Sequence, residues 1–281
     1  MIRIGPSGND ELFYEQGYKN TEQVFSWLKN MGLNAYEYSF GRGIIMTDAK
    51  AILIGQNAQQ NDVAISVHAP YFINFANTDE LMVQKSFDYV TKSLNIIKLM
   101  GGNRVVVHTA SCGKLDRTEA LLLVERRLSD LAIIVEQQYS DCLVCLETMG
   151  KYSQIGTYEE IIDLCTISPN FLPTLDFGHI NCILQGGLKT KNDFIKIFQY
   201  CIDRLGYERT KKVHIHFSKI EYGPKGESKH LTLADESYGP EVEPLLEAIK
   251  ELNLEPRIIC ESRGIMAQDA KKIKEKYENL F

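Results

Sequence analysis

Long hydrophobic runs are missing from this sequence. Its longest apolar stretches, such as Leu121–Val124 and Leu131–Val135, fall far short of the roughly 20 residues that a membrane-spanning helix needs. The first residues, MIRIGPSGNDEL, also lack the apolar segment of a secretory signal peptide. We therefore expect a cytoplasmic protein that does not act on membranes.

An excess of positive charge is also missing. The 281 residues include 31 Lys and Arg against 37 Asp and Glu, which gives a formal net charge of −6. This balance excludes a histone-like or polybasic protein, so any binding to a polyanion would depend on a local basic surface.

The seven cysteines do not form a recognisable framework. Their number is odd, and they are spread through apolar segments. Cys142 and Cys145 form a CxxC motif, but no second pair accompanies it. We interpret the cysteines as buried reduced thiols rather than as a zinc or redox pair.

Short apolar runs alternate with amphipathic segments along the whole chain. The runs expected to form strands are Ile2–Ile4, Ala35–Tyr38, Ile65–His68, Val105–His108, Leu143–Glu147, Pro173–Asp176, Val213–His216 and Arg257–Glu261. The segments expected to form helices are Asn20–Met31, Leu81–Met100, Arg117–Gln138, Tyr158–Cys165, Lys191–Leu205, Pro240–Leu252 and Ala267–Leu280. No Pro- or Ser-rich linker or internal repeat interrupts them, so residues 1–281 are predicted to form one domain.

Eight strands that alternate with helices predict parallel pairing through right-handed crossovers. In a chain of this length they favour an α/β fold of the closed (β/α)8 TIM-barrel type, and an open doubly wound sheet is the alternative. No GxGxxG motif follows the first strand. Its absence argues against a dinucleotide-binding sheet and against a nucleotide cofactor.

Polar side chains stand at the carboxyl ends of the expected strands, where TIM-barrel enzymes place their catalytic groups. In chain order they are His68, His108, Glu147, Asp176, His179, His214, His216 and Glu261, with His230 on the loop after the seventh strand. Imidazole and carboxylate groups without thiolate are ligands that suit zinc, manganese or iron. Because these groups outnumber the ligands of one tetrahedral ion, we predict two or three ions that share a bridging carboxylate.

Six segments resemble, in order and spacing, the motifs of the endonuclease IV family of apurinic/apyrimidinic endonucleases. They are SVHAPYFINFAN, VVVHTAS, CLETMGK, TLDFGHIN, VHIHFSKIEYGPKGESKH and IICES. The resemblance implies a xylose-isomerase-like barrel, three zinc ions and base-excision repair. The substrate would be double-stranded DNA with an abasic site, cut on the 5′ side to leave a 3′-hydroxyl.

The resemblance also assigns metal ligands residue by residue. His68 and His108 match ligands of the first zinc, and Glu147 matches the carboxylate that bridges to the second. The remaining ligands of the second zinc are matched by Asp176, His214 and Glu261. Two ligands of the third zinc are matched by His179 and His230.

Two positions depart from the family's pattern. The third zinc of the family has an aspartate two residues before the histidine, where this chain has Ser228. Glu227 is the nearest substitute. His216 shares a strand face with His214 and is a candidate for an additional group at or behind the metals.

Catalytic and substrate-binding roles follow from the same comparison. Glu147 and Glu261 are expected to hold the metal pair and to orient the attacking hydroxide. Tyr71 and Phe72 lie where the family has its DNA-intruding loop, and Arg42 could reach the groove or the backbone. The lysines predicted to form a basic rim are Lys151, Lys219, Lys225 and Lys229.

Two other functions remain open at this point. Sugar isomerases and epimerases with this barrel use one divalent metal and a pair of glutamates as acid and base, which Glu147 and Glu261 would also provide. A binding or scaffold protein that keeps the barrel is the other possibility, and it would turn over neither abasic DNA nor ketoses.

Overall fold

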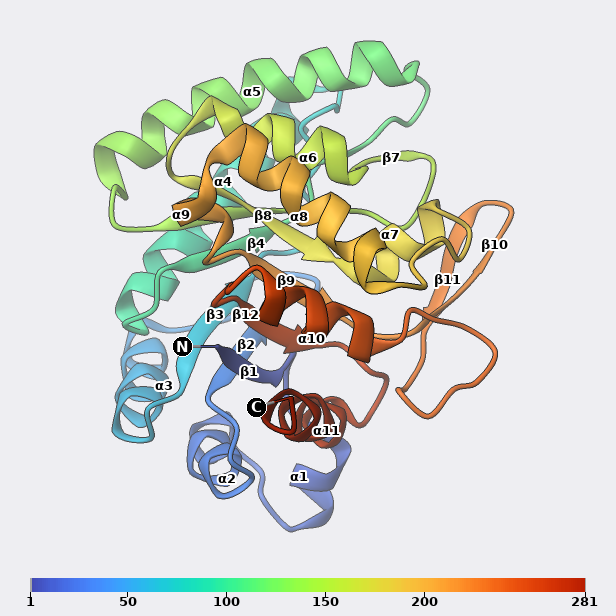
Figure 1. The fold of residues 1–281 in the computed structure, drawn as a ribbon. Coiled ribbons are helices and arrows are strands. Elements are labelled where there is room, and N and C mark those ends of the chain that lie inside the picture. Colours follow the sequence, from blue (N-terminus) through green and yellow to red (C-terminus); the bar gives the residue numbers. More distant parts are fainter. Residues whose placement is uncertain (1, 281) are drawn as a thin grey trace.

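Eight parallel strands form the centre of the molecule, and helices surround them (Figure 1). The structure is a computed structural model that describes residues 2–280. The barrel strands are β1 (Arg3–Pro6), β2 (Ala35–Ser39), β3 (Ala64–His68), β4 (Arg104–Val107), β6 (Leu143–Glu147), β8 (Phe171–Asp176), β9 (His214–Phe217) and β12 (Arg257–Cys260). They pair in the order β1-β12-β9-β8-β6-β4-β3-β2.

The first and last strands of this order meet and nearly close the barrel. The backbone N–H of Gly8 donates to the carbonyl of Glu37 at 2.9 Å. A Cβ atom at Gly5 would lie 1.7 Å from the carbonyl oxygen of Ala35, so only glycine allows β1 to approach β2 this closely. The predicted (β/α)8 barrel is confirmed, and each of the eight predicted strands overlaps an observed one.

The helices of the outer ring are largely those that the periodicity predicts. They are α1 (Glu11–Glu15), α2 (Val24–Asn30), α3 (Asp48–Gln60), α4 (Glu80–Leu99), α5 (Arg117–Gln138), α6 (Tyr158–Leu164), α7 (Phe177–Ile183), α8 (Lys191–Leu205), α9 (Tyr207–Thr210), α10 (Val242–Glu251) and α11 (Met266–Glu278). The pattern missed α3, whose buried face consists mostly of small residues, Ala51, Gly55 and Ala58, together with Ile54. A face this small in volume gives a weak apolar signal among Gln and Asn residues.

Alternation along each strand separates the helix-facing side chains from those inside the barrel. On β9, Ile215 and Phe217 join the main hydrophobic core under the helices. The alternate residues His214 and His216 are fully buried on the opposite face, inside the barrel. A barrel interior is commonly filled by branched apolar side chains, so imidazoles at these positions mark the interior as polar.

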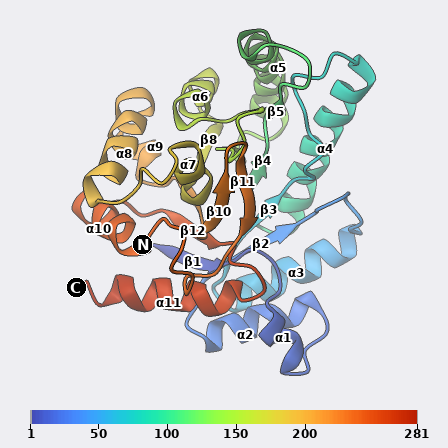
Figure 2. The same ribbon diagram turned by 90° about the vertical axis from the view of Figure 1, so that its right-hand side faces the viewer.

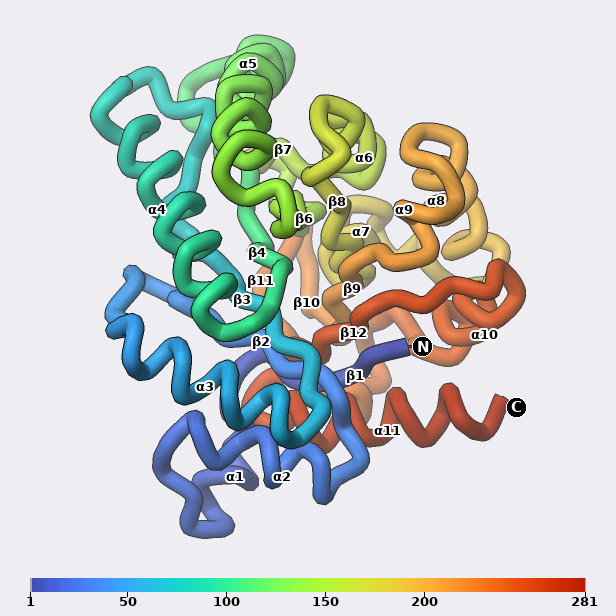
Figure 3. Tube along the Cα trace, turned by 90° about the vertical axis from the view of Figure 1, so that its left-hand side faces the viewer, coloured from blue at the N-terminus to red at the C-terminus, as the bar shows by residue number. Residues whose placement is uncertain are grey.

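A hairpin stands over the mouth of the barrel, at the carboxyl ends of the strands (Figure 2). It consists of β10 (Ile220–Gly223) and β11 (Gly226–His230). A second antiparallel pair, β5 (Ala110–Ser111) with β7 (Gln154–Ile155), links the loops after β4 and β6. The opposite face, where the strands begin, carries no such extension (Figure 3). Within residues 2–280, no helix has the length and apolarity to cross a bilayer.

Candidate metal centre

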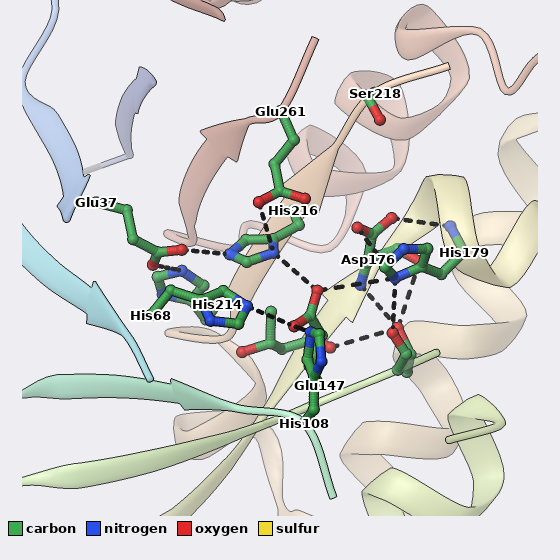
Figure 4. Close-up of polar contacts among 12 residues, drawn as sticks. Glu37, His68, His108, Glu147, Asp176, His179, His214, His216, Ser218 and Glu261 are labelled. Carbon is green, nitrogen blue, oxygen red and sulfur yellow. Dashed lines mark hydrogen bonds and ion pairs between the residues drawn. The ribbon is translucent and has the colours of Figure 1, made fainter. Parts of the chain in front are cut away.

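The polar strand ends converge on one cavity at the mouth of the barrel. Its volume is about 390 Å³. The ionisable residues that line it are His68, His108, Glu147, Lys151, His179, Glu227, His230 and Glu261. Figure 4 shows His68, His108 and His216 directed toward Glu147. Residues from distant parts of the chain therefore meet at one place, as the barrel topology predicts.

The first group consists of His68, His108 and Glu147. The Nε2 atoms of the two histidines lie 3.1 and 3.0 Å from the same carboxylate oxygen, Oε2 of Glu147. These three side chains come from the ends of β3, β4 and β6. Two imidazoles and one carboxylate facing one point form a donor set that zinc commonly accepts.

The second group shares Glu147 and adds Asp176, His216 and Glu261. Nδ1 of His216 lies 3.0 Å from Oε1 of Glu147 and 3.6 Å from Oε1 of Glu261. Oδ2 of Asp176 is buried without a hydrogen bond. Because Glu147 presents Oε2 to the first group and Oε1 to the second, its carboxylate is placed to bridge them.

The third group consists of His179, Glu227 and His230. Nε2 of His179 lies 3.5 Å from Oε2 of Glu227, and Nε2 of His230 lies 3.7 Å from Oε1. The hairpin supplies Glu227 and His230. It is held in place where the backbone N–H of Glu227 donates to the carbonyl of Gly150 at 2.7 Å. The resemblance to the endonuclease IV family would place an aspartate at position 228, where this chain has Ser228. Glu227, the preceding residue, is the carboxylate of this group instead.

Two of these histidines are oriented by a contact between Nδ1 and a backbone carbonyl. Nδ1 of His68 lies 2.8 Å from the carbonyl oxygen of its neighbour Ala69. Nδ1 of His179 is held by the carbonyl of Thr148 at 2.9 Å. A carbonyl can only accept, so both rings carry a proton on Nδ1 and present Nε2 to the groups.

The carboxylates of the site favour positive charge on the groups beside them. Burial lowers the pKa of His68, but its hydrogen bond to Glu147 and the charges of Glu147 and Glu37 together outweigh burial and raise the pKa to about 9. Burial also lowers the pKa of His179, and the charge of Asp176 is the largest effect that opposes it and brings the pKa to about 9. Burial acts to raise the pKa of Glu147, yet the charge of His216 helps to hold it well below its usual range. These histidines therefore hold protons beside carboxylates that a divalent cation would also neutralise. The residues thus fit a metal.

The structure corrects the predicted place of His214. In the register of the sheet, His216 pairs with Asp176, whereas His214 pairs with Thr174, two residues deeper in the barrel. His214 faces Glu37 instead, with Nε2 3.0 Å from Oε2. Burial lowers the pKa of His214 to about 3, so its ring is neutral. His216 occupies the place in the second group that the resemblance assigns to His214.

A short helix follows β8 directly. Helix α7 begins at Phe177, and Asp176 caps it by accepting from the backbone N–H of His179 at 2.8 Å. The cap points the first turn of α7 at the site and thereby places His179.

The predicted basic rim is smaller than expected. Lys219 is buried, and its Nζ donates to the carbonyl of Asp235 at 2.6 Å and contacts Glu241 at 2.5 Å. Lys219 lies two residues after the end of β9, before the hairpin begins. Its ammonium group contacts other residues of the protein and is not available at the mouth.

The other predicted cations remain exposed. Lys225 lies between the hairpin strands, and Lys151 lines the cavity. Lys229 is exposed but pairs with Glu221 at 2.8 Å. Of the four predicted lysines, Lys151 is therefore at the cavity and Lys225 is exposed at the turn of the hairpin.

An exposed aromatic pair stands at the rim opposite the hairpin. The rings of Tyr71 and Phe72 lie 4.6 Å apart, and their exposed fractions are 46% and 54%. Nε of Arg42 donates to the hydroxyl of Tyr71 at 3.0 Å. The three residues that were predicted to contact substrate thus form one surface beside the cavity.

Sequence reasoning missed Glu37, the buried partner of His214. A carboxylate in the middle of the apolar strand AYEYS was a usable signal, because a buried charge is costly unless it is paired. The cysteines agree with their interpretation as thiols, since all seven are free. No cysteine belongs to the candidate metal groups found among residues 2–280.

Comparison with known proteins identifies the family. A family model described as a xylose isomerase-like TIM barrel matches residues 25–280. The chain belongs to this family. An uncharacterised protein of Methanocaldococcus jannaschii is 29% identical, and the match covers 90% of each chain.

Members of the family named probable endonuclease 4 are also similar to this chain. Those from Mycoplasma genitalium and Acholeplasma laidlawii are 27% and 30% identical, over 68% and 63% of this chain. The matches span 62% and 59% of those relatives, less than two thirds of their length. They confirm the resemblance to the endonuclease IV family.

Solved structures show the same xylose isomerase-like barrel. Endonuclease IV from Thermus thermophilus has a TM-score of 0.74 at 17% identity and covers 99% of both chains. A D-tagatose 3-epimerase-like protein has a TM-score of 0.67 at 20% identity, over 88% of this chain and 89% of that one. At these identities the likeness shows the fold alone.

Proposed function

We propose that this protein is a zinc-dependent endonuclease that cuts double-stranded DNA on the 5′ side of abasic sites. The observation that carries the proposal is the arrangement of three ligand groups around one cavity, with Glu147 shared by the first two. A clustered set of divalent cations suits phosphodiester cleavage, because the attacking and the leaving oxygen both need charge stabilisation. Manganese or iron in place of zinc is compatible with the same imidazole and carboxylate ligands.

Bound cations would neutralise the phosphodiester and lower the pKa of the attacking water. The residues of this chain would hold and orient them. Glu147 would bridge the first two groups, and Glu261, which is partly exposed, would face the substrate side of the second. His179, Glu227 and His230 would hold a third cation, which would supply charge stabilisation to the leaving oxygen.

The rim would recognise the lesion. An abasic nucleotide must leave the helical stack, and aromatic side chains commonly fill the space that remains. Tyr71 and Phe72 are exposed enough for this role. Arg42, which donates to the hydroxyl of Tyr71, would contact the DNA backbone beside them. Lys151 and Lys225 would contact phosphates across the cavity.

The experiment that tests the proposal combines metal analysis with cleavage of a defined duplex. Protein with a measured metal content is incubated with a duplex that contains one tetrahydrofuran lesion and with the undamaged duplex. We expect two to three zinc ions per chain and a single cut on the 5′ side of the lesion that leaves a 3′-hydroxyl. A metal-replete protein that leaves the lesion intact would contradict the proposal.

A sugar epimerase or isomerase is the second candidate, and one observation favours it. The group of Glu147, Asp176, His216 and Glu261 is complete for a single cation, with a glutamate on either side. A cavity of about 390 Å³ also lies within the range of small-molecule sites. This candidate predicts one exchangeable manganese per chain and turnover of ketoses. The first and third groups would then have no role in the reaction.

A further inference from the structure

A buried carboxylate lies beneath the metal groups. Glu37 is fully buried on β2, a strand that contributes no residue to the three groups at the mouth. One hydroxyl and two imidazoles surround its carboxylate. The hydroxyl of Ser66 donates to Oε2 at 2.8 Å, and Nε2 of His214 lies 3.0 Å from the same oxygen. Nε2 of His216 lies 2.9 Å from the other oxygen, Oε1 (Figure 4).

His216 connects this carboxylate to the second group. Its Nδ1 faces Glu147 at 3.0 Å, so its two ring nitrogens point to carboxylates on opposite sides. A histidine that binds a cation through one nitrogen carries its proton on the other. A carboxylate that accepts this proton fixes the tautomer and the ring orientation, and it makes the free nitrogen a stronger ligand.

The other histidines of the site have weaker anchors. His68 and His179 are held by backbone carbonyls, and His230 is held by the hydroxyl of Ser218 at 2.9 Å. The nitrogen of His216 that faces away from Glu147 meets Glu37, a buried carboxylate that belongs to none of the three groups at the mouth. The position of His216 therefore depends on a charged group outside these three groups.

A separate cation site at Glu37, His214 and His216 is the competing explanation. Their ligand atoms lie within 4.8 Å of one another. However, all three side chains are fully buried, and none of them lines the cavity at the mouth. Each of the other three groups has at least one member that lines this cavity. The enclosed position favours a supporting role for Glu37 over a separate cation site.

We propose that Glu37 is a positioning residue that orients His216 to hold a cation in the second group. The inference rests on the proposed function only in requiring that this group binds a divalent cation. It does not depend on which substrate the protein cleaves.

The test compares zinc affinity between the wild-type chain and Glu37→Gln, measured by competition with a chromophoric chelator. The amide keeps the volume of the side chain but removes its charge. We expect the affinity of one site to fall by about 10- to 100-fold. Asp10→Asn is the matched control. Asp10 is equally buried but accepts from the backbone N–H groups of Leu12 and Ala267 and belongs to none of the candidate metal groups. Its zinc affinity should match the wild type even if its stability falls.

A second readout requires no variant. In zinc-loaded protein with ¹⁵N-labelled histidine, NMR should show the proton of His216 on Nε2. A proton on Nδ1, or a Glu37→Gln affinity within twofold of the wild type, would overturn the inference. A wild-type chain that binds zinc but leaves abasic DNA intact would contradict the proposed function, and the affinity comparison would still decide the role of Glu37.

Discussion

At the scale of single residues, each side chain of the site depends on its depth in the barrel. His214 and His216 belong to one strand face, yet only His216 reaches the level of Asp176. Glu147 reaches two groups because its two oxygens point to different histidines. The position of a residue along its strand, or the direction of a carboxylate oxygen, therefore decides which group a side chain joins.

The role of Glu261 can be tested by its amide. Glu261→Gln removes one charged member of the second group and leaves the volume nearly unchanged. Loss of an outer partner of a metal ligand already costs about 10- to 100-fold, so loss of a direct ligand should lower abasic-site cleavage by at least about 100-fold. Glu221→Gln, on the outer part of the hairpin, is the control and should retain activity. Near wild-type cleavage by metal-replete Glu261→Gln would remove Glu261 from the site.

Protonation of the site should be visible in the stability of chelator-treated protein. The pKa of His68 and that of His179 are raised from 6.5 to about 9 in the folded state. A raised pKa stabilises the fold fully below 6.5, and this contribution is lost as the pH rises through about 9. Thermal unfolding followed at several pH values should therefore give a falling Tm across this interval. Zinc-loaded protein should show a smaller fall, and a metal-free Tm that rises from pH 7 to 9 would contradict the assignment.

At the scale of elements, the hairpin of β10 and β11 is the part that completes the site. It brings Glu227 and His230 over the mouth, although neither lies on a barrel strand. Its docking requires close backbone contact. Gly226 has φ of +96°, and a Cβ atom there would lie 2.1 Å from the carbonyl oxygen of Gly150. Glycine is therefore needed at this contact both for its conformation and for its size.

Gly226→Ala should release the hairpin without unfolding the barrel. We expect the metal content to fall by about one zinc per chain, because Glu227 and His230 would no longer face His179. Gly223→Ala is the matched control in the same hairpin, since a Cβ atom there meets nothing within 4 Å. Elemental analysis and thermal unfolding of both variants provide the measurement. Equal metal content in the two would show that the third group does not depend on this contact.

At the scale of the whole molecule, the net charge of −6 disfavours binding to DNA, so the proposed substrate would have to bind through the rim. Affinity for duplex with a tetrahydrofuran lesion should fall steeply between about 50 and 200 mM salt. Lys151→Ala combined with Lys225→Ala should weaken binding. It should also reduce the slope of log affinity against log salt concentration by the equivalent of about two phosphate contacts. Lys229→Ala, which removes a lysine already paired with Glu221, should change the slope less. An affinity that does not change with salt concentration would argue for a small neutral substrate instead.

Much of this molecule could be predicted from its residues alone. Strand and helix periodicities have different lengths, and their alternation over eight units leaves few topologies other than a barrel. Because the carboxyl ends of barrel strands meet, the sequence alone predicts that His68, His108, Glu147, Asp176 and Glu261 lie at one mouth.

The tertiary structure decided what linear spacing does not contain. The register of β9 against β8 selects His216 over His214 for the second group. The turn after β9 buries Lys219, and the docking of the hairpin brings Glu227 to His179. Glu37 gained its partners only when β2 came to lie across the barrel from β9. Sequence patterns report which face a residue occupies, whereas depth, register and contacts across the barrel arise from packing between distant strands.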